Sequence, residues 1–238
     1  MNTPRRIAVA IDGYSSTGKS TMARWLAAQV GYAYIDTGAM YRAVTLHCLN
    51  NHLIDGDRVD EQALAADLEA GKVDISFAPG KNGRNITLLG GKDVEREIRS
   101  MHVSDKVSII AALGFVRRQM VALQQAMGRG KGVVMDGRDI GTVVLPDAEL
   151  KVFVTADPDV RAQRRYDELV GKGDTEVTLE QVRQNVLERD RIDTTRAESP
   201  LRRADDALEL DNSYLTIDEQ NEILLDMFNK TVSALAAE

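Results

Sequence analysis

Residues 13–20 read G-Y-S-S-T-G-K-S and match the phosphate-loop pattern G-x-x-x-x-G-K-[ST]. In such a loop, successive backbone N–H groups surround a polyphosphate, and glycines let the chain turn tightly. Lys19 can then reach the outer phosphates, and the Ser20 hydroxyl can bind Mg²⁺. The expected contacts to a nucleoside triphosphate are Gly13, Tyr14, Ser15, Ser16, Thr17, Gly18, Lys19, Ser20 and Thr21.

The segments beside the loop favour this interpretation over a chance match in an ordinary turn. Residues 7–11 form a short apolar run that is typical of a buried parallel strand. Residues 21–30 carry Met22, Trp25 and Leu26 at helical spacing. A strand, a glycine loop and a helix N-terminus in this order form an anion-binding site.

Apolar strand candidates recur along the chain with helical patterns between them, which predicts a parallel α/β sheet flanked by helices. The last helix begins at a capping box, Thr216 to Glu219, and one apolar stripe should pack on the sheet. The expected core strands are residues 7–11, 32–35, 132–135, 150–154 and 207–210. The stripe comprises Ile223, Leu224, Met227, Phe228, Val232 and Leu235.

A first departure from this alternation lies at residues 55–94, here called the insertion. Short runs with strand-like alternation are joined there by glycine-rich turns, which predicts a small antiparallel sheet inserted between core elements. Its strand candidates are residues 73–77, 86–88 and 92–94, with a turn at 79–83.

A second departure lies at residues 155–203, here called the lid, which are rich in arginine and have a helical pattern. Asp157-Pro158 begins one helix, and a capping box at residues 178–181 begins another after the glycines at 171 and 173. We expect a loosely attached helical hairpin. The phosphate-loop core then comprises residues 1–54, 95–154 and 204–238.

Composition narrows the class of protein. The 238 residues are 43% hydrophobic, which supports a large core, and no apolar run approaches the ~18 residues of a membrane span. The one cysteine, Cys48, cannot form an internal disulfide and suits a reducing cytoplasm. His47, His52 and His102 lack metal-ligand spacing.

The net charge of −7 is concentrated at the C-terminus. Residues 204–238 contain nine acids and one base, a charge of −8, so the remainder carries +1 and can still bind anions. No basic stripe of a duplex-binding protein is present, so a nucleic-acid partner is not expected. Because no exposed apolar seam demands a dimer, we expect a monomer.

The string Asp136-Gly-Arg-Asp-Ile-Gly141 follows an apolar strand at the sheet edge where α/β proteins bind ligands. Asp136 is expected to help place Mg²⁺ near the phosphate loop. The alternative is a turn with a surface salt bridge, which the shared sheet edge disfavours.

Thr37, Tyr41 and Arg42 follow the second strand and open the next helix. They can line the first turns beside a nucleotide, where an arginine would suit a second phosphate. Equally, Thr37 can be a helix N-cap and Arg42 a solvated helix residue. Spacing alone does not choose between these interpretations.

Seven arginines lie between residues 161 and 196. Arg161, Arg164 and Arg165 share one helix face, and Arg189, Asp193 and Arg196 share another. Surface ion pairing is the alternative explanation. A mobile lid would instead carry guanidinium groups to a phosphoryl transition state, whose charge spreads over equatorial oxygens that planar arginine donors fit.

Ser108 and Arg117 are nine positions apart and would point in opposite directions on one unbroken helix. Both can contact one ligand if the helix breaks, and Gly114 is the expected place.

Several longer strings carry a family resemblance over nearly the whole chain. They are I-D-G-Y-S-S-T-G-K-S-T (11–21), I-D-T-G-A-M-Y-R (35–42), E-I-R-S (97–100), D-G-R-D-I-G-T-V-V-L-P-D-A (136–148), R-A-Q-R-R (161–165) and E-R-D-R-I-D-T-T-R (188–196). Together they resemble the bacterial cytidylate kinases of the nucleoside monophosphate kinase superfamily.

The resemblance implies a phosphate-loop core, a monophosphate-binding insertion and a lid, and Mg²⁺- and ATP-dependent phosphorylation of CMP and dCMP. It implies catalytic roles for Lys19, Arg161, Arg164 and Arg165, and Mg²⁺ placement by Ser20 and Asp136. Ser108, Asp139, Arg189 and Asp193 resemble base- and sugar-reading positions. Arg42, Arg138 and Arg196 resemble phosphate-binding positions. The implied CMP site comprises Thr37, Tyr41, Arg42, Ser108, Arg117, Arg138, Asp139, Arg189, Asp193 and Arg196.

Three positions depart from the family pattern. Tyr14 stands where proline is usual, Ser16 where glycine is frequent, and Thr37 where serine is commoner. A residue with a Cβ at position 16 restricts the loop. Gly13, Gly18 and Lys19 remain, so we expect binding to survive.

Other functions make different demands on the sequence. A shikimate- or gluconate-type kinase shares the loop but needs no second phosphate site. A GTP-binding switch needs an Asn-Lys-x-Asp string, which the chain lacks. A catalytically dead scaffold is disfavoured by the presence of Lys19, Ser20 and Asp136.

Overall fold

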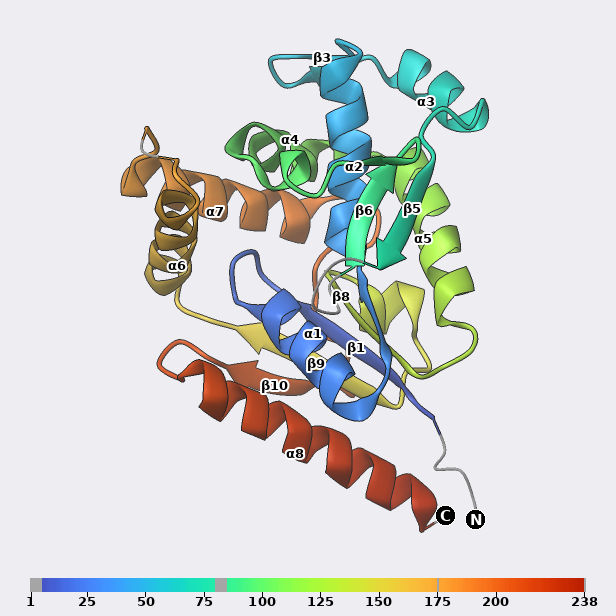
Figure 1. The fold of residues 1–238 in the computed structure, drawn as a ribbon, viewed down its shortest axis with the longest axis vertical. Helices are drawn as coiled ribbons and strands as arrows, with labels where there is room; N and C mark the ends of the chain where they lie inside the picture. Colours follow the sequence, from blue (N-terminus) through green and yellow to red (C-terminus); the bar gives the residue numbers. More distant parts are fainter. Residues whose placement is uncertain (1–5, 80–84, 175, 238) are drawn as a thin grey trace.

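The computed structural model describes residues 6–79, 85–174 and 176–237. Within these residues, the core is a parallel five-stranded sheet in the order β10-β9-β1-β8-β2 (Figure 1). All the expected core strands are confirmed. They are β1 (Ala8–Gly13), β2 (Ala33–Asp36), β8 (Val133–Gly137), β9 (Leu150–Thr155) and β10 (Leu208–Asp211).

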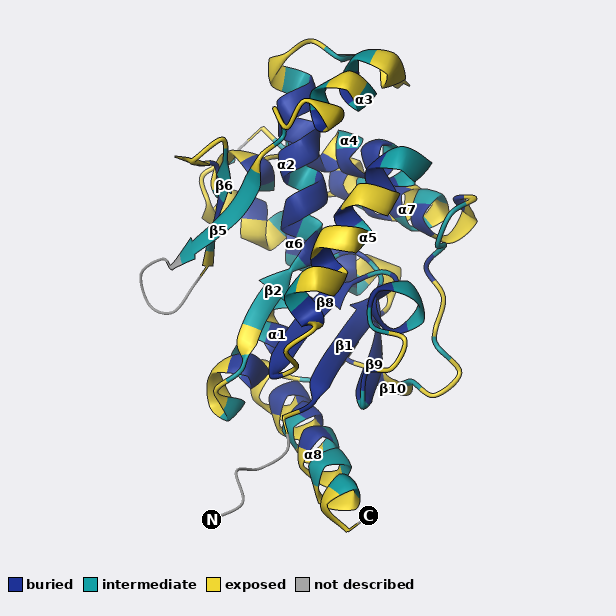
Figure 2. Ribbon diagram, turned by 90° about the vertical axis from the view of Figure 1, so that its right-hand side faces the viewer, coloured by how far each residue is buried: buried dark blue, intermediate teal, exposed yellow. Residues whose placement is uncertain are grey.

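Side chains of the central strands alternate between the two faces of the sheet, as the period of a strand requires. Val9 and Ile11 pack with helices α1 (Lys19–Val30) and α8 (Ile217–Ala236) on one face. Ala8 and Ala10 face α5 (Gly114–Gly128) and a π-helical turn, Ile140–Val144. Both faces are therefore covered, and the central strands β1 and β8 are buried throughout (Figure 2).

The final helix confirms the predicted capping box, since Thr216 and Glu219 cap each other's backbone. Leu224 and Phe228 form the buried centre of its stripe. The assignment of Ile223 to this stripe is wrong, because its side chain is 38% exposed. It lies one step of about 100° to the solvent side of Leu224, and Leu225 contacts the core instead.

The insertion forms the expected antiparallel sheet from β5 (Ile75–Pro79), β6 (Asn85–Leu89) and β7 (Lys92–Asp93). Most of the turn expected at 79–83 lies outside the described residues. We did not predict a hairpin of β3 (Ile54–Asp55) and β4 (Arg58–Val59), which begins one residue before the insertion, or helix α3 (Glu61–Glu69) within it.

Helix α3 is stabilised because its apolar side packs against helix α2 (Thr37–Asn50). Asp60 caps the N-terminus of α3 by accepting from the backbone N–H of Ala63. Leu64 and Leu68, one turn apart, are buried in a cluster with residues of α2 such as Val44. This spacing and the cap were the available signals in the sequence.

The lid consists of α6 (Pro158–Gly171) and α7 (Leu179–Thr195), which confirms the two predicted helix starts. Helix α7 packs against both α6 and α4 (Met101–Ala112). The predicted break between Ser108 and Arg117 is present as well: α4 ends before Leu113, α5 begins at Gly114, and the helices are bent by 94°. Among the described residues, no single helix is long and apolar enough to cross a membrane.

Candidate functional site

The phosphate loop connects the end of β1 to the start of α1, and two glycines make its path possible. Gly13 has φ 152°, and a Cβ there would lie 2.1 Å from the carbonyl oxygen of Val154 on β9. Gly18 has φ 83° and occupies the N-cap position of α1. The backbone N–H groups at the N-terminus of α1 therefore lie at the end of the phosphate loop. A loop and a helix N-terminus in this arrangement bind phosphate.

Lys19 is buried at this loop and lines a cavity of about 1300 Å³. Its Nζ donates to the carbonyl oxygen of Tyr14 at 2.8 Å. Burial, together with the positive charge of Arg138, lowers the pKa of Lys19 to about 7. An anionic ligand beside Nζ would favour the charged form again, so this lysine is suited to a phosphate partner.

Ser20 and Asp136 meet beside Lys19. The Ser20 hydroxyl donates to Oδ2 of Asp136 at 2.6 Å, and the Tyr34 hydroxyl donates to Oδ1 at 2.8 Å. Burial raises the pKa of Asp136 to about 6, with a contribution from the charge of Asp36. Two hard oxygen donors next to a phosphate site match the few protein ligands that Mg²⁺ takes when phosphates and water supply the rest.

Ser16 adopts φ 58°, in the left-handed region that favours glycine. We expect Ser16→Gly to raise the free energy of unfolding by about 0.5–1 kcal/mol, because relief of the Cβ strain exceeds the added entropy of the unfolded chain. Thermal denaturation measures this. Ser233→Gly, on an exposed turn of α8, should instead destabilise. A lower melting temperature for Ser16→Gly would contradict the assigned strain.

A second, smaller pocket adjoins the cavity at the phosphate loop. All ten residues of the expected CMP site line it, although they come from α2, α4, α5, α7, the segment after β8 and the C-cap of α7, Arg196. The 94° bend between α4 and α5 brings Ser108 and Arg117 to the same pocket. Gly38, Val107, Ala111 and Gly137 complete the lining.

Ion pairs organise the charged groups in the smaller pocket. Arg117, 2% exposed, pairs with Asp139, and Arg138 Nε lies 2.7 Å from Oδ2 of Asp193. Arg196 lies 3.6 Å from Asp193 and 3.9 Å from Asp139. The lining contains five arginines and two aspartates, an excess of three positive charges that fits a phosphate monoester.

Neighbouring charges keep Asp193 ionised within this pocket. Although burial alone would raise the pKa of Asp193, the charges of Arg138, Arg196 and Arg189 hold it below the ordinary value. The carboxylate can therefore accept hydrogen bonds from its arginine partners and from a bound ligand.

The structure separates the two interpretations of the segment after β2. Asp36, not Thr37, is the N-cap of α2, and the Thr37 hydroxyl donates to the carbonyl oxygen of Asp136 at 2.7 Å. Arg42 is not a solvated helix residue: it donates to the carbonyl oxygen of Ile98 at 3.1 Å and lines both pockets. Burial and the charge of Arg189 lower its pKa.

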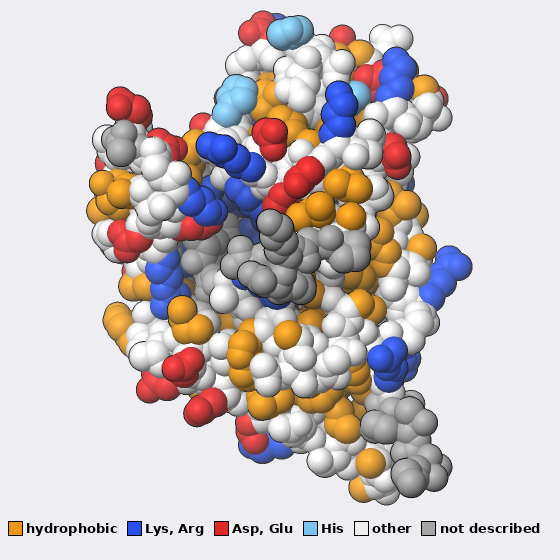
Figure 3. Space-filling model, viewed as in Figure 1, with side chains coloured by type: hydrophobic (Ala, Val, Ile, Leu, Met, Phe, Trp, Pro, Cys, Tyr) orange, Lys and Arg blue, Asp and Glu red, His pale blue; other side chains and the backbone are white. Residues whose placement is uncertain are grey.

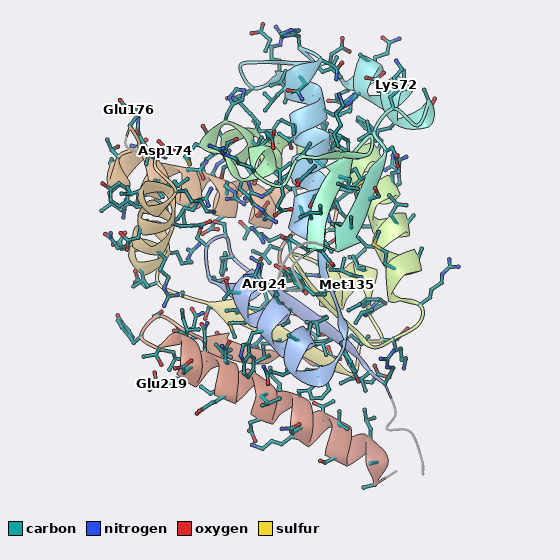
Figure 4. All side chains as sticks on the ribbon, in the orientation of Figure 1. Arg24, Lys72, Met135, Asp174, Glu176 and Glu219 are labelled. Carbon is teal, nitrogen blue, oxygen red and sulfur yellow. The ribbon has the colours of Figure 1, made fainter. Side chains whose placement is uncertain are left out.

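The three lid arginines on α6 have different surroundings. Arg165 lines the large cavity, and its Nη2 donates to the carbonyl oxygen of Arg99 at 3.0 Å. Arg161 donates to the carbonyl oxygen of Ser15 at 3.1 Å, whereas Arg164 donates to the side chain and backbone of Asn212. Lysine and arginine side chains gather in the hollow between the lid and the insertion (Figure 3). Arg24 lies at the α1 side of this hollow (Figure 4).

Sequence analysis missed three acidic or phenolic groups beside the site. Asp12 accepts from the backbone N–H groups of Ile140 and Gly141 and so holds the segment after β8 against β1. Tyr34 binds Asp136, and Asp190 contacts the phosphate loop. Asp12 and Asp190 lie inside the motif strings, directly before Gly13 and after Arg189, and their positions were the available signal.

Comparison with known proteins identifies close relatives. A model of the cytidylate kinase family matches residues 9–230. The chain is 57% identical over 231 residues to the cytidylate kinase of Parabacteroides distasonis, which covers 97% of this chain and 100% of that protein. The same values hold for the cytidylate kinase of Bacteroides fragilis. For that of Bacteroides thetaiotaomicron, the identity is 57% over 229 residues, with 96% and 99% covered.

Proposed function

The chain belongs to the cytidylate kinase family, and we propose that its two adjoining pockets divide the work of phosphorylating CMP with ATP. The large cavity holds the polyphosphate of ATP at Lys19, and the smaller pocket holds CMP. One observation carries this division: Arg42, Arg138 and Arg189 line both pockets. Positive charge therefore lies at the boundary, where a phosphoryl group would pass from donor to acceptor.

The chemistry fits the groups at that boundary. The phosphate of CMP is already ionised near neutral pH, so the transfer needs positioning and positive charge more than a general base. Lys19, Arg42 and Arg138 are held in place by the contacts described above, and Nη1 of Arg189 donates to the Ser104 hydroxyl at 3.2 Å. These cations can therefore stabilise developing charge with little reorganisation. Arg161, Arg164 and Arg165 are proposed to complete the donor side when the lid is closed, which also excludes water.

We propose that Ser20 binds Mg²⁺ and that Asp136 acts on it through water. When bound, the ion would neutralise phosphate charge. The hydrogen bond between Ser20 and Asp136 keeps the two oxygens together. Tyr34, which donates to the other carboxylate oxygen, fixes the orientation of Asp136.

Recognition of the nucleoside is proposed for residues that line the smaller pocket. Ser108 and Asp139 are buried there, and Arg117 holds Asp139 in place. Arg189 and Asp193 approach from α7 and are proposed to contact the sugar. A site that hydrogen-bonds a polar base edge rejects analogues that leave its buried groups unpaired. We propose that both CMP and dCMP are accepted.

The remaining proposals concern the oligomeric state, the cellular location and the partners of the enzyme. We propose that the chain acts as a monomer in the cytoplasm without a nucleic-acid partner. Both pockets are built within one chain, and its one cysteine is a buried thiol. Sedimentation equilibrium would test the oligomeric state.

An acceptor panel tests the proposed function directly. With Mg²⁺ and ATP, we expect ADP release with CMP and dCMP to exceed that with UMP, AMP or shikimate by at least about tenfold, since one mismatched buried polar contact has an effect of that size. Chelation of the metal with EDTA should remove the activity. Preference for shikimate, or equal rates with all acceptors, would contradict the assignment of the smaller pocket to CMP.

A further inference from the structure

We propose that Asp190 is a positioning residue for the ATP side of the site, where it and the ring of Tyr14 hold Arg161 against the phosphate loop. The inference rests on the proposed function of that loop as the ATP site. We call Asp190, Tyr14 and Arg161 the clamp. Asp190 comes from α7, Arg161 from α6 and Tyr14 from the loop itself, so the clamp connects both lid helices to the core.

Arg161 is fixed on several sides. Its side chain is 3% exposed, Nε donates to the carbonyl oxygen of Ala156 at 2.9 Å, and Nη1 donates to the carbonyl oxygen of Ser15 at 3.1 Å. Nη1 also lies 2.7 Å from Oδ2 of Asp190. A guanidinium held by fixed acceptors loses little rotamer freedom when a ligand binds, which is how a positioned group contributes to affinity.

Asp190 connects Arg161 to the loop backbone. While Oδ2 pairs with Arg161, Oδ1 faces the backbone N–H and the hydroxyl of Ser15, each at 3.4 Å. The carboxylate therefore bridges a lid arginine and the third residue of the loop. Because its side chain is only 14% exposed, solvent screens the pair much less than it screens surface pairs.

Tyr14 is the third member of the clamp, and its aromatic ring contacts Arg161. The Arg161 guanidinium carbon lies 5.2 Å from the centre of the Tyr14 ring, within the range of a cation–π contact. The ring packs edge-on against Phe153 of β9 at 5.9 Å and is thereby supported by the core sheet. The carbonyl of Tyr14 also accepts from Lys19, so the same residue contacts two cations of the ATP side.

The contacts of Asp190 determine which substrate should respond. Asp190 follows Arg189, which lines the CMP pocket, but the hydrogen bonds and the ion pair of the Asp190 carboxylate go to Ser15 and Arg161. Loss of the carboxylate should loosen Arg161 and the loop while the CMP pocket keeps its own pairs. The effect should therefore appear in ATP binding and not in the KM for CMP.

A double-mutant cycle tests the clamp in the full-length protein. We expect Asp190→Asn to raise the Kd for Mg²⁺–ATP, measured by calorimetry, about tenfold, the size of one charge-assisted hydrogen bond. Tyr14→Leu should raise it about fivefold, as expected for a buried cation–π contact. If Asp190 acts through Arg161, Asp190→Asn should have little further effect in an Arg161→Ala background. The KM for CMP should stay within about twofold of wild type, because its pocket is unchanged.

Glu188→Gln is the matched control, since Glu188 forms an exposed ion pair with Arg191 on the same helix. Glu188→Gln should change neither the Kd for Mg²⁺–ATP nor the KM for CMP. Additive effects of Asp190→Asn and Arg161→Ala, an unchanged Kd for ATP in Asp190→Asn, or equal rises in the constants for both nucleotides would overturn the clamp. Failure of the wild-type protein to phosphorylate CMP would count against the proposed function alone, because the ATP cycle needs no acceptor.

Discussion

Lys19→Met should lower kcat/KM several-hundred-fold, about 3.5 kcal/mol of transition-state stabilisation, without lowering the melting temperature. The variant loses the cation that is proposed to contact the phosphates of ATP but keeps a side chain of similar length. Folding should not suffer, because the ammonium of Lys19 is buried and accounts for one hydrogen bond to Tyr14. Steady-state kinetics measure the change in kcat/KM, and thermal denaturation measures the change in melting temperature.

The difference in the free energy of unfolding between Lys19→Met and the wild type should also depend on pH in a defined direction. The pKa of Lys19 is lowered from 10.5 to about 7 in the folded protein, so between these values the unfolded chain binds more protons. Wild-type stability attributable to this group therefore rises with pH across that range, and the full penalty of burying the charge is present below pH 7. Relative to wild type, Lys19→Met should be most stable near pH 6 and lose this advantage toward pH 10.

Lys230→Met serves as the control for both measurements, because Lys230 lies on the exposed side of α8 and pairs with Asp226 at 2.6 Å. It should leave kinetics and the pH dependence of stability unchanged. A Lys19→Met enzyme with wild-type turnover would refute the catalytic role of Lys19. A large loss of stability at pH 6 would refute the assigned cost of burial.

Arg117→Met should lower the free energy of unfolding by about 3–5 kcal/mol and the melting temperature by roughly 10 °C. Arg117 is fully enclosed, where it pairs with Asp139, donates to the carbonyl oxygen of Ala111 at 3.0 Å and lies over the ring of Tyr41. Its removal leaves Asp139 buried without its closest partner. The KM for CMP should rise about a hundredfold, since a charge-assisted contact and the pocket geometry are both lost.

A compensating variant separates these two effects. In Arg117→Met/Asp139→Leu, no uncompensated carboxylate remains, so most of the lost stability should return. CMP binding should not return, because both polar groups are missing from the pocket. If stability and CMP binding recovered together, the pair would be structural only. If stability did not recover, unpaired charge would not be the cause of the loss.

The core of the fold could be predicted from the sequence because its signals are local. Each core strand is a short apolar run, and the loop, the proline-led helix α6 and both capping boxes are read within a few residues. Helix α3 was missed because Leu64 and Leu68 give only two buried positions in a polar segment. Ile223 was misplaced because apolar character alone does not say which side of a helix stripe faces the sheet.

The candidate site likewise contains features that could be predicted from the sequence and features that could not. The residues that line the smaller pocket come from positions 37 to 196, and their common lining could be expected only through the family resemblance. Ser108 and Arg117 lie outside its motif strings. The break between α4 and α5 is a partial exception, because helix geometry requires it if Ser108 and Arg117 contact one ligand. It lies at Leu113, one residue before the expected Gly114. The contacts of Asp190 and Asp12 depend on how α7 and the segment after β8 pack on the phosphate loop and β1. Such long-range contacts leave no periodic trace in a single sequence.

The most direct test of two facing pockets is a crystal structure with CMP, Mg²⁺ and a non-hydrolysable ATP analogue bound together. We expect the terminal phosphate of the analogue beside Lys19 and the CMP phosphate on Arg42, Arg138 and Arg196, with the two phosphates facing each other across the boundary between the pockets. If those arginines turned away from the bound monoester, or if CMP lay outside the smaller pocket, the account would be contradicted.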